Sequence, residues 1–258
     1  MAIEPAQRRE ADTPVQAPEL ALPASLNGAG ASRLAGADAG APLSVQLPRE
    51  WPLPGADEVF RGIYTRAGVQ SGDVLAVCSA IAGEGKTTIG VGLGVTLAQD
   101  FPDRHVLLVE TDLQRPVLAA DFQVEAGPGL AECLLNGWPL EPAYRPTLFD
   151  NLQLLPAGGP VANPSRLLRS SRMAMAVDAM RQSHDVVILD LPAVLVTSDA
   201  LLLSDLADGV ILVVRAGVTP ASLVAKALEQ FDEDKLRGVV LNGAQSAIPR
   251  WLRRLCGL

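Results

Sequence analysis

A glycine-rich segment that ends in a lysine and two threonines is the part of this chain best suited to chemistry. Residues 74–88 read Val-Leu-Ala-Val-Cys-Ser-Ala-Ile-Ala-Gly-Glu-Gly-Lys-Thr-Thr, an apolar run followed by a turn. In such a turn the backbone N–H groups point at phosphate oxygens, the lysine reaches the β and γ phosphates, and a hydroxyl ligates magnesium. The predicted nucleotide-binding residues of this turn are Ala82, Gly83, Glu84, Gly85, Lys86, Thr87 and Thr88.

Three carboxylates that follow apolar runs complete a candidate magnesium site. Glu110 and Asp112 come after the run 106–109, and Asp190 ends the run 186–190. Since ligands bind where parallel strands end, we expect these side chains to face the phosphate loop. A helix-capping role stays open for Asp112 and for Asp190. The predicted metal ligands are Thr87, Glu110, Asp112 and Asp190.

The elements that must position these residues alternate between apolar runs and helical patterns. We predict a single α/β domain over residues 51–258, with a doubly wound, mostly parallel sheet typical of P-loop NTPases. Residues 1–50 are rich in Ala, Pro and Gly and are predicted to be a disordered leader. The predicted strands are 73–79, 105–110, 185–189, 209–214 and 238–241, and the predicted helices begin after Pro54 and cover 86–99, 173–182, 199–206 and 220–231.

Composition limits the function classes. The net charge of -8 argues against a nucleic-acid partner, because phosphate backbones recruit basic surfaces. The three cysteines form no C-x-x-C pair, which favours a reducing cytoplasm over a disulfide framework. An electron-transfer ATPase would need cysteines that hold a cluster between subunits, and the position of Cys78 within the first predicted strand argues against it. No window of transmembrane length is free of charge, so no spanning segment is predicted and any membrane location would come through a partner.

Taken together, the motifs resemble those of the bacterial tyrosine kinases of exopolysaccharide and capsule synthesis, within the deviant P-loop ATPases that include the septum-site and partition ATPases. Ala80 replaces the first glycine of the usual phosphate loop, as in the kinases, and Ile81 stands where partition ATPases carry lysine. Residues 110–116, Glu-Thr-Asp-Leu-Gln-Arg-Pro, resemble the family's second acidic motif. Residues 155–168 resemble its Pro-Ala-Gly and Asn-Pro-x-x-Leu-Leu segment, and Asn242 resembles an asparagine that lies near adenine.

The resemblance implies a cytoplasmic enzyme that uses ATP and Mg²⁺. Its catalytic residues would be Lys86, Asp112 and Asp190, with Asp112 taking the proton of a tyrosine hydroxyl. The implied partners are a membrane-bound polysaccharide chain-length regulator, which would hold the protein at the inner face of the membrane, and a tyrosine-containing protein substrate.

The chain departs from the family's pattern at two places, one that bears on assembly and one that bears on function. The family's oligomer-forming helix reads Glu-x-x-Arg-x-x-Arg, whereas this chain has Glu58, Arg61 and then Tyr64, which leaves a homo-oligomer open. The family also ends in a tyrosine cluster, but the only tyrosines here are Tyr64 and Tyr144, and the basic tail 248–255 has none. The alternative is an ATP-controlled switch that hydrolyses ATP without transfer to tyrosine.

Overall fold

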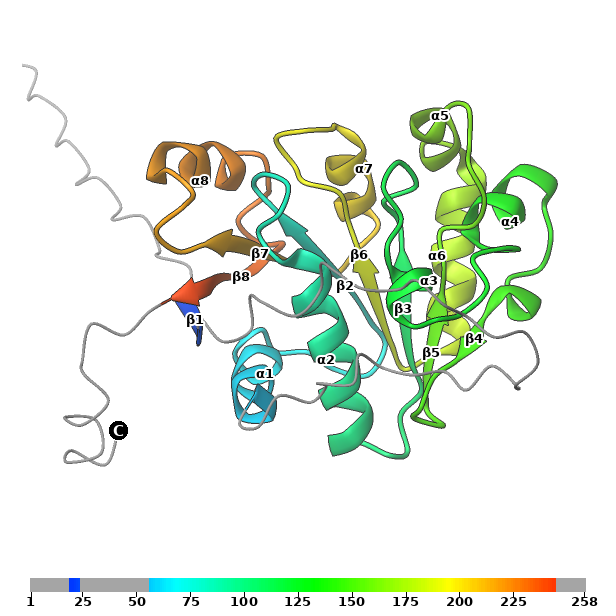
Figure 1. The fold of residues 1–258 in the computed structure, drawn as a ribbon, viewed down its shortest axis with the longest axis horizontal. Helices are drawn as coiled ribbons and strands as arrows, with labels where there is room; N and C mark the ends of the chain where they lie inside the picture. Colours follow the sequence, from blue (N-terminus) through cyan, green and yellow to red (C-terminus); the bar gives the residue numbers. More distant parts are fainter. Residues whose placement is uncertain (1–18, 24–55, 245–258) are drawn as a thin grey trace, which may run out of the picture.

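The computed structural model describes residues 19–23 and 56–244, so the predictions for most of the leader and for the basic tail lie outside the described residues (Figure 1). The strands are β1 (Glu19–Pro23), β2 (Asp73–Ser79), β3 (Val106–Glu110), β4 (Arg145–Pro146), β5 (Leu152–Leu155), β6 (Val186–Asp190), β7 (Gly209–Arg215) and β8 (Leu236–Ala244). The helices are α1 (Ala56–Arg66), α2 (Lys86–Asp100), α3 (Leu118–Asp121), α4 (Leu130–Asn136), η2 (Glu141–Ala143), α5 (Pro164–Leu168), α6 (Ser171–Ser183), α7 (Asp199–Asp205) and α8 (Ala221–Leu228).

The strands form one sheet in the order β1-β8-β7-β2-β6-β3-β5-β4 (Figure 1). Within the described residues, neighbouring strands pair in parallel, except that β4 and β5 are antiparallel. The predicted mostly parallel, doubly wound fold is therefore confirmed. Strand β2, which leads into the phosphate loop, lies between β7 and β6, and β3 lies beyond β6. This order brings the carboxyl ends of four strands around one loop.

One short segment of the predicted leader forms a strand in the structure. Residues 19–23 form strand β1, which pairs in parallel with β8, with Glu19 opposite Val239 and Ala21 opposite Leu241. The segment reads Glu-Leu-Ala-Leu-Pro, a brief apolar run between prolines that was hidden by the Ala- and Pro-rich composition around it. An edge strand offers unpaired N–H and C=O groups, and β1 covers those of β8.

Two hydrophobic layers, one on each face of the sheet, bury the strands. Alternate strand residues pack against α1 and α2 on one face, as Leu108 and Ile188 do. The other face packs against α4, α6 and α7 through residues such as Leu107 and Leu189. Burial on both faces explains why the strands read as continuous apolar runs rather than as alternating patterns.

Helix α1 lies against α2 because α2 has a glycine under an aromatic ring. A Cβ built on Gly92 would approach the ring of Phe60 to 2.0 Å, and Phe60 is 1 % exposed, so the ring has no room to move away.

We predict that Gly92→Ala destabilises the fold by about 1–3 kcal/mol through overpacking, measured by denaturant unfolding. The matched control is Gly90→Ala on the same helix, where the nearest atom would lie at 3.7 Å and stability should be unchanged or higher. Equal stability of the two variants would contradict this account of the α1–α2 contact.

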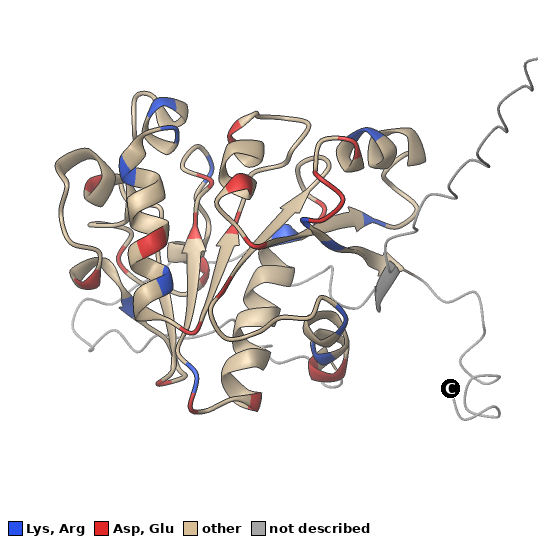
Figure 2. Cartoon of the chain, turned by 180° about the vertical axis from the view of Figure 1, so that it is seen from behind, with Lys and Arg blue, Asp and Glu red and all other residues tan. Residues whose placement is uncertain are grey.

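In the cartoon of Figure 2, positions of Lys and Arg are interspersed with positions of Asp and Glu along the described helices and loops. None of the helices within residues 56–244 has the length and apolar character needed to cross a bilayer.

Candidate active site

The phosphate loop connects β2 to α2 and depends on two glycines with left-handed backbone angles. Gly83 has φ 85° and Gly85 has φ 94°, values that side chains with a Cβ rarely adopt. A Cβ on Gly85 would also meet the side-chain nitrogen of Asn242 at 2.2 Å. Ala82 and Gly83 are exposed at the loop, and Thr88 follows, half-buried, in the first turn of α2. These features leave the N-terminal N–H groups of α2 accessible to an anion.

Four of the predicted side chains meet beside this loop. The ammonium nitrogen of Lys86 lies 3.2 Å from Oδ1 of Asp190 and 3.8 Å from Oδ2 of Asp112. The hydroxyl of Thr87 donates to the other oxygen of Asp190 at 2.6 Å. Strands β2, β3 and β6 thus bring together residues that are far apart in the sequence.

Burial shapes the electrostatics of this cluster. Removal from water raises the pKa of Asp190, and the positive charge of Lys86 together with the Thr87 hydrogen bond opposes this rise. A carboxylate held in this way beside a hydroxyl has the donor types that Mg²⁺ takes when phosphates and water supply the remaining ligands. Thr87 and Asp190 therefore fit a nucleotide-bound magnesium ion. Within the described residues no group of three or more His, Cys, Asp or Glu side chains converges as an independent metal site.

Asp112 lies in the loop after β3 with its carboxylate toward Lys86. Its neighbour Thr111 fixes this loop to β6, because the backbone N–H and the hydroxyl of Thr111 both donate to the carbonyl of Asp190, at 3.1 and 2.7 Å. The second Asp112 oxygen accepts the N–H of Arg115 at 3.2 Å. The capping alternatives are wrong for both aspartates, since α3 begins only at Leu118 and the helix after β6 begins only at residue 199.

Glu110 does not join the cluster. One of its oxygens accepts the backbone N–H groups of Val117 and Leu118, the latter at 2.7 Å, and the other accepts that of Ala157 at 3.2 Å. This geometry does not support the prediction that Glu110 ligates magnesium. The strand end was placed correctly, but the longer side chain turns away from the phosphate loop.

Glu84 also points away from the position of the phosphates. One carboxylate oxygen accepts the N–H of Ile81 at 2.7 Å, and the other accepts the N–H of Arg215 at 3.1 Å and the hydroxyl of Thr219. The amide nitrogen of Asn242 donates to the backbone carbonyl of Glu84 at 2.8 Å. Glu84 therefore ties the phosphate loop to the segment after β7 and to β8.

Arg215 and Thr219 were not predicted as part of the site. Arg215 also donates from its guanidinium to the carbonyl of Gly83 at 3.3 Å. The signal that could have found them is topological, because β7 pairs with β2 and must end beside the phosphate loop.

Replacing Glu84 with alanine would leave three donors without their acceptor in a buried region. Because an unsatisfied buried group costs about 1–3 kcal/mol, we predict that Glu84→Ala weakens nucleotide binding roughly tenfold. Titration with a fluorescent ATP analogue measures this, with the exposed Glu229→Ala as the control. Wild-type affinity in the Glu84 variant would show that the loop keeps its shape without this carboxylate.

Asn242 has a feature that suits a base-recognition role. Its side-chain oxygen is buried and has no hydrogen-bond partner in the part of the chain that the structure describes. A buried acceptor without a donor is costly unless a ligand supplies one. An exocyclic amino group, such as that of adenine, is a suitable donor.

Both tyrosines are held within the fold. The Tyr64 hydroxyl donates to Asp100 at 2.8 Å, beside the Arg61 guanidinium that pairs with the same carboxylate at 2.7 Å. Burial and the Asp100 contact raise the pKa of Tyr64 to about 12. Tyr144 packs edge-on against the ring of His184, with centroids 5.1 Å apart. Neither residue belongs to the cluster of Lys86, Thr87, Asp112 and Asp190.

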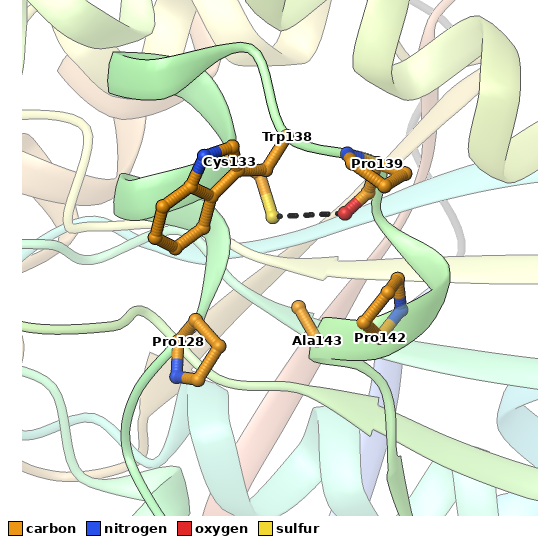
Figure 3. Close-up of a pocket in the computed structure, with 6 residues that line it drawn as sticks. All are labelled: Pro128, Cys133, Trp138, Pro139, Pro142 and Ala143. Carbon is orange, nitrogen blue, oxygen red and sulfur yellow. Dashed lines mark hydrogen bonds between the residues drawn. The ribbon is translucent and has the colours of Figure 1, made fainter.

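A small pocket between α4 and η2 has a different character (Figure 3). Its volume is about 210 Å³, and the thiol of Cys133 donates to the carbonyl of Pro139 at 3.5 Å within it. The remaining lining is apolar, so the pocket has no charged group for a phosphate. None of the candidate site residues lines it; the lining residues are Pro128, Cys133, Trp138, Pro139, Pro142 and Ala143.

Curated relatives of the chain are bacterial kinases and polysaccharide export proteins. It is 34% identical over 192 residues to the tyrosine-protein kinase YwqD of Bacillus subtilis, covering 72% of this chain and 80% of that relative. It is 33% identical over 176 residues to the succinoglycan biosynthesis transport protein ExoP of Rhizobium meliloti, covering 66% of this chain but only 22% of ExoP. No family model matches the chain.

The chain is also similar to solved structures. The chimeric protein CapA2B2 superimposes with a TM-score of 0.70 at 30% identity, over 76% of this chain and 88% of that one. The septum site-determining protein MinD of Pyrococcus horikoshii, solved with Mg-ADP, matches with a TM-score of 0.56 over 70% of this chain and 76% of that one. At 23% identity, the likeness to MinD establishes a shared fold alone.

Proposed function

The chain belongs to the bacterial tyrosine kinases of exopolysaccharide and capsule synthesis, and on this basis we propose that it transfers the γ phosphate of ATP to a tyrosine of another protein. The observation that carries the proposal is the convergence of Lys86, Thr87, Asp112 and Asp190 at one end of the sheet. Lys86 is suited to bind the phosphates, and Thr87 and Asp190 are suited to bind magnesium. The carboxylate of Asp112 is then free to accept a proton.

Each residue has a distinct part in the proposed reaction. Lys86 exchanges its carboxylate contacts for the β and γ phosphates, while the N–H groups from Gly83 to Thr88 bind phosphate oxygens. Magnesium held by Thr87 and Asp190 would supply positive charge to the phosphates. Asp112, released from Lys86, accepts the proton of the incoming tyrosine hydroxyl. Asn242 orients the base through its unpaired oxygen.

The acceptor tyrosine belongs to another polypeptide. Tyr64 and Tyr144 are engaged in packing and hydrogen bonds, and no other tyrosine occurs in the chain. ExoP, a succinoglycan biosynthesis transport protein, matches this chain over 22% of its own length, which supports a role for this chain in polysaccharide export. We propose that the protein works at the cytoplasmic face of the membrane, bound to a membrane-bound chain-length regulator of polysaccharide export.

The second candidate is an ATP-controlled switch without transfer to tyrosine. The observation that favours it is the absence of a free tyrosine beside the site and of any tyrosine in residues 245–258. The two functions differ in the acceptor, which is a tyrosine hydroxyl in one and water in the other.

A phosphotyrosine assay separates the two. Purified protein is incubated with ATP, Mg²⁺ and a tyrosine-containing peptide polymer, with and without the cytoplasmic tail of a membrane-bound chain-length regulator. The kinase proposal predicts phosphotyrosine on the added polypeptides and none on Tyr64 or Tyr144. ATP turnover with no phosphotyrosine on either acceptor would favour the switch.

A further inference from the structure

Glu110 closes the loop that carries Asp112. Strand β3 ends at Glu110, the chain then forms the loop 111–116, and it returns at Val117 and Leu118. The backbone N–H groups of both returning residues donate to one oxygen of Glu110. A single carboxylate thus joins the two ends of the loop in which Asp112 lies.

The other Glu110 oxygen connects this loop to the segment after β5. It accepts the N–H of Ala157 at 3.2 Å, and the same segment is braced by Glu132, which accepts the N–H groups of Gly129 and Gly159 at 2.7 and 2.9 Å. Glu110 is 1 % exposed, so water does not compete for these contacts. Hydrogen bonds from neutral donors to a charged acceptor are stronger than those between neutral groups.

The length of the side chain decides which of two positions the carboxylate occupies. Glu110 is paired in register with Asp190 on the neighbouring strand, so a shorter side chain would hold its carboxylate beside that of Asp190. One additional methylene extends the reach by about 1.5 Å. In this structure the added reach brings the carboxylate to the amides of Val117 and Leu118.

We propose that Glu110 is a positioning residue that fixes the 111–116 loop and thereby holds Asp112 at the acceptor side of Lys86, and that it is not a magnesium ligand. This role depends on the proposed function only for the group that accepts the γ phosphate. A loop held in this way positions Asp112 equally for a tyrosine hydroxyl or for water. Its effect should therefore appear in kcat rather than in the binding of ATP or magnesium.

Two conservative variants distinguish positioning from ligation. Glu110→Gln keeps the length and retains a carbonyl acceptor for Val117 and Leu118, but it loses the charge. Glu110→Asp keeps the charge and loses the reach. Positioning by reach predicts that kcat falls at least tenfold in Glu110→Asp and less in Glu110→Gln. Ligation of magnesium predicts the reverse order, because a carboxylate binds the ion better than a neutral amide.

The experiment measures kcat, KM for ATP and the half-saturating Mg²⁺ concentration, together with amide hydrogen exchange in peptides covering residues 111–118 and 155–159. We expect Glu110→Asp to show faster exchange in 111–118, with KM and the Mg²⁺ requirement within about twofold of wild type. Glu132→Asp is the matched control, because it shortens a carboxylate that braces 155–159 without contacting the Asp112 loop. Its kcat should stay within about twofold of wild type.

Three results would overturn the proposal: a raised Mg²⁺ requirement in Glu110→Gln, wild-type kcat in Glu110→Asp, or unchanged exchange in 111–118. If no phosphotyrosine forms even with wild type, the proposed function fails, and kcat is then taken from phosphate release. The exchange data and the order of the two variants still test the role of Glu110.

Discussion

Asp112→Asn is expected to reduce the rate of phosphotyrosine formation by about 10²- to 10⁴-fold, the usual contribution of a general base. The substitution keeps the shape of the side chain and removes its ability to accept a proton. Asp112 lies 3.8 Å from the Lys86 ammonium nitrogen, and its other oxygen accepts the N–H of Arg115, so we expect ATP affinity to change by only a few-fold. Radiolabelled transfer to a tyrosine peptide measures the rate, and a fluorescent ATP analogue measures affinity.

The control for this prediction is Asp234→Asn, which makes the same change at an exposed position. A variant that loses ATP binding in proportion to transfer would show that Asp112 acts on the nucleotide rather than on the tyrosine proton. A variant with wild-type transfer would remove Asp112 from the mechanism altogether.

Lys86→Met is expected to weaken ATP binding at least tenfold and to abolish detectable transfer. Within residues 56–244, Lys86 is the cation that forms ion pairs with both Asp112 and Asp190, and methionine retains most of its length without the charge. The loss of charge leaves the buried Asp190 carboxylate without an ion pair and removes the contact to the β and γ phosphates. Isothermal titration with ATP and Mg²⁺, followed by the transfer assay, measures both effects.

The exposed Lys226→Met is the matched control and should behave as wild type. This prediction holds for a kinase and for a switch alike, because both need the γ phosphate in place. Retained ATP affinity in Lys86→Met would contradict the assignment of the phosphate loop itself.

The sequence predicted the structure best where one short segment contains both a strand or helix and the residues of the candidate site. The run into Gly85-Lys86-Thr87 predicted β2, the loop and α2 correctly, with α2 extending one residue further, to Asp100. The predicted strands 105–110 and 185–189 correspond to β3 (Val106–Glu110) and β6 (Val186–Asp190), so the first begins one residue later than predicted and the second is shifted by one residue. Both strands are buried and apolar up to the carboxylate that ends them. Parallel strand order then follows from the crossover helices.

The region between β3 and α6 was not predicted because its elements are short. Helices α3, α4 and α5 and strands β4 and β5 have too few residues to establish a period, and most of their stability comes from packing on the rest of the domain. The segment 155–168 was noticed for its motif, but no element was assigned to it. Its role in holding Glu110 and Glu132 could not be read from spacing alone.

The sequence also did not predict how individual side chains are oriented. The sequence places Glu110 at a strand end and Glu84 in the phosphate loop, but the amides that bind their carboxylates come from residues 117–118, 157 and 215, among others. These partners are set by tertiary structure. The sequence placed both glutamates near the phosphate loop, but it did not indicate which amides their carboxylates contact.

The fate of the γ phosphate tests the central claim most directly. Wild-type protein is supplied with γ-labelled ATP, Mg²⁺ and the tyrosine-containing cytoplasmic tail of a polysaccharide chain-length regulator, and label is counted in phosphotyrosine and in free phosphate. A tyrosine kinase predicts that label accumulates in phosphotyrosine on the tail and that Asp112→Asn suppresses this accumulation. Label found only in free phosphate, with the tail present and ATP consumed, would contradict the account and identify an ATPase switch.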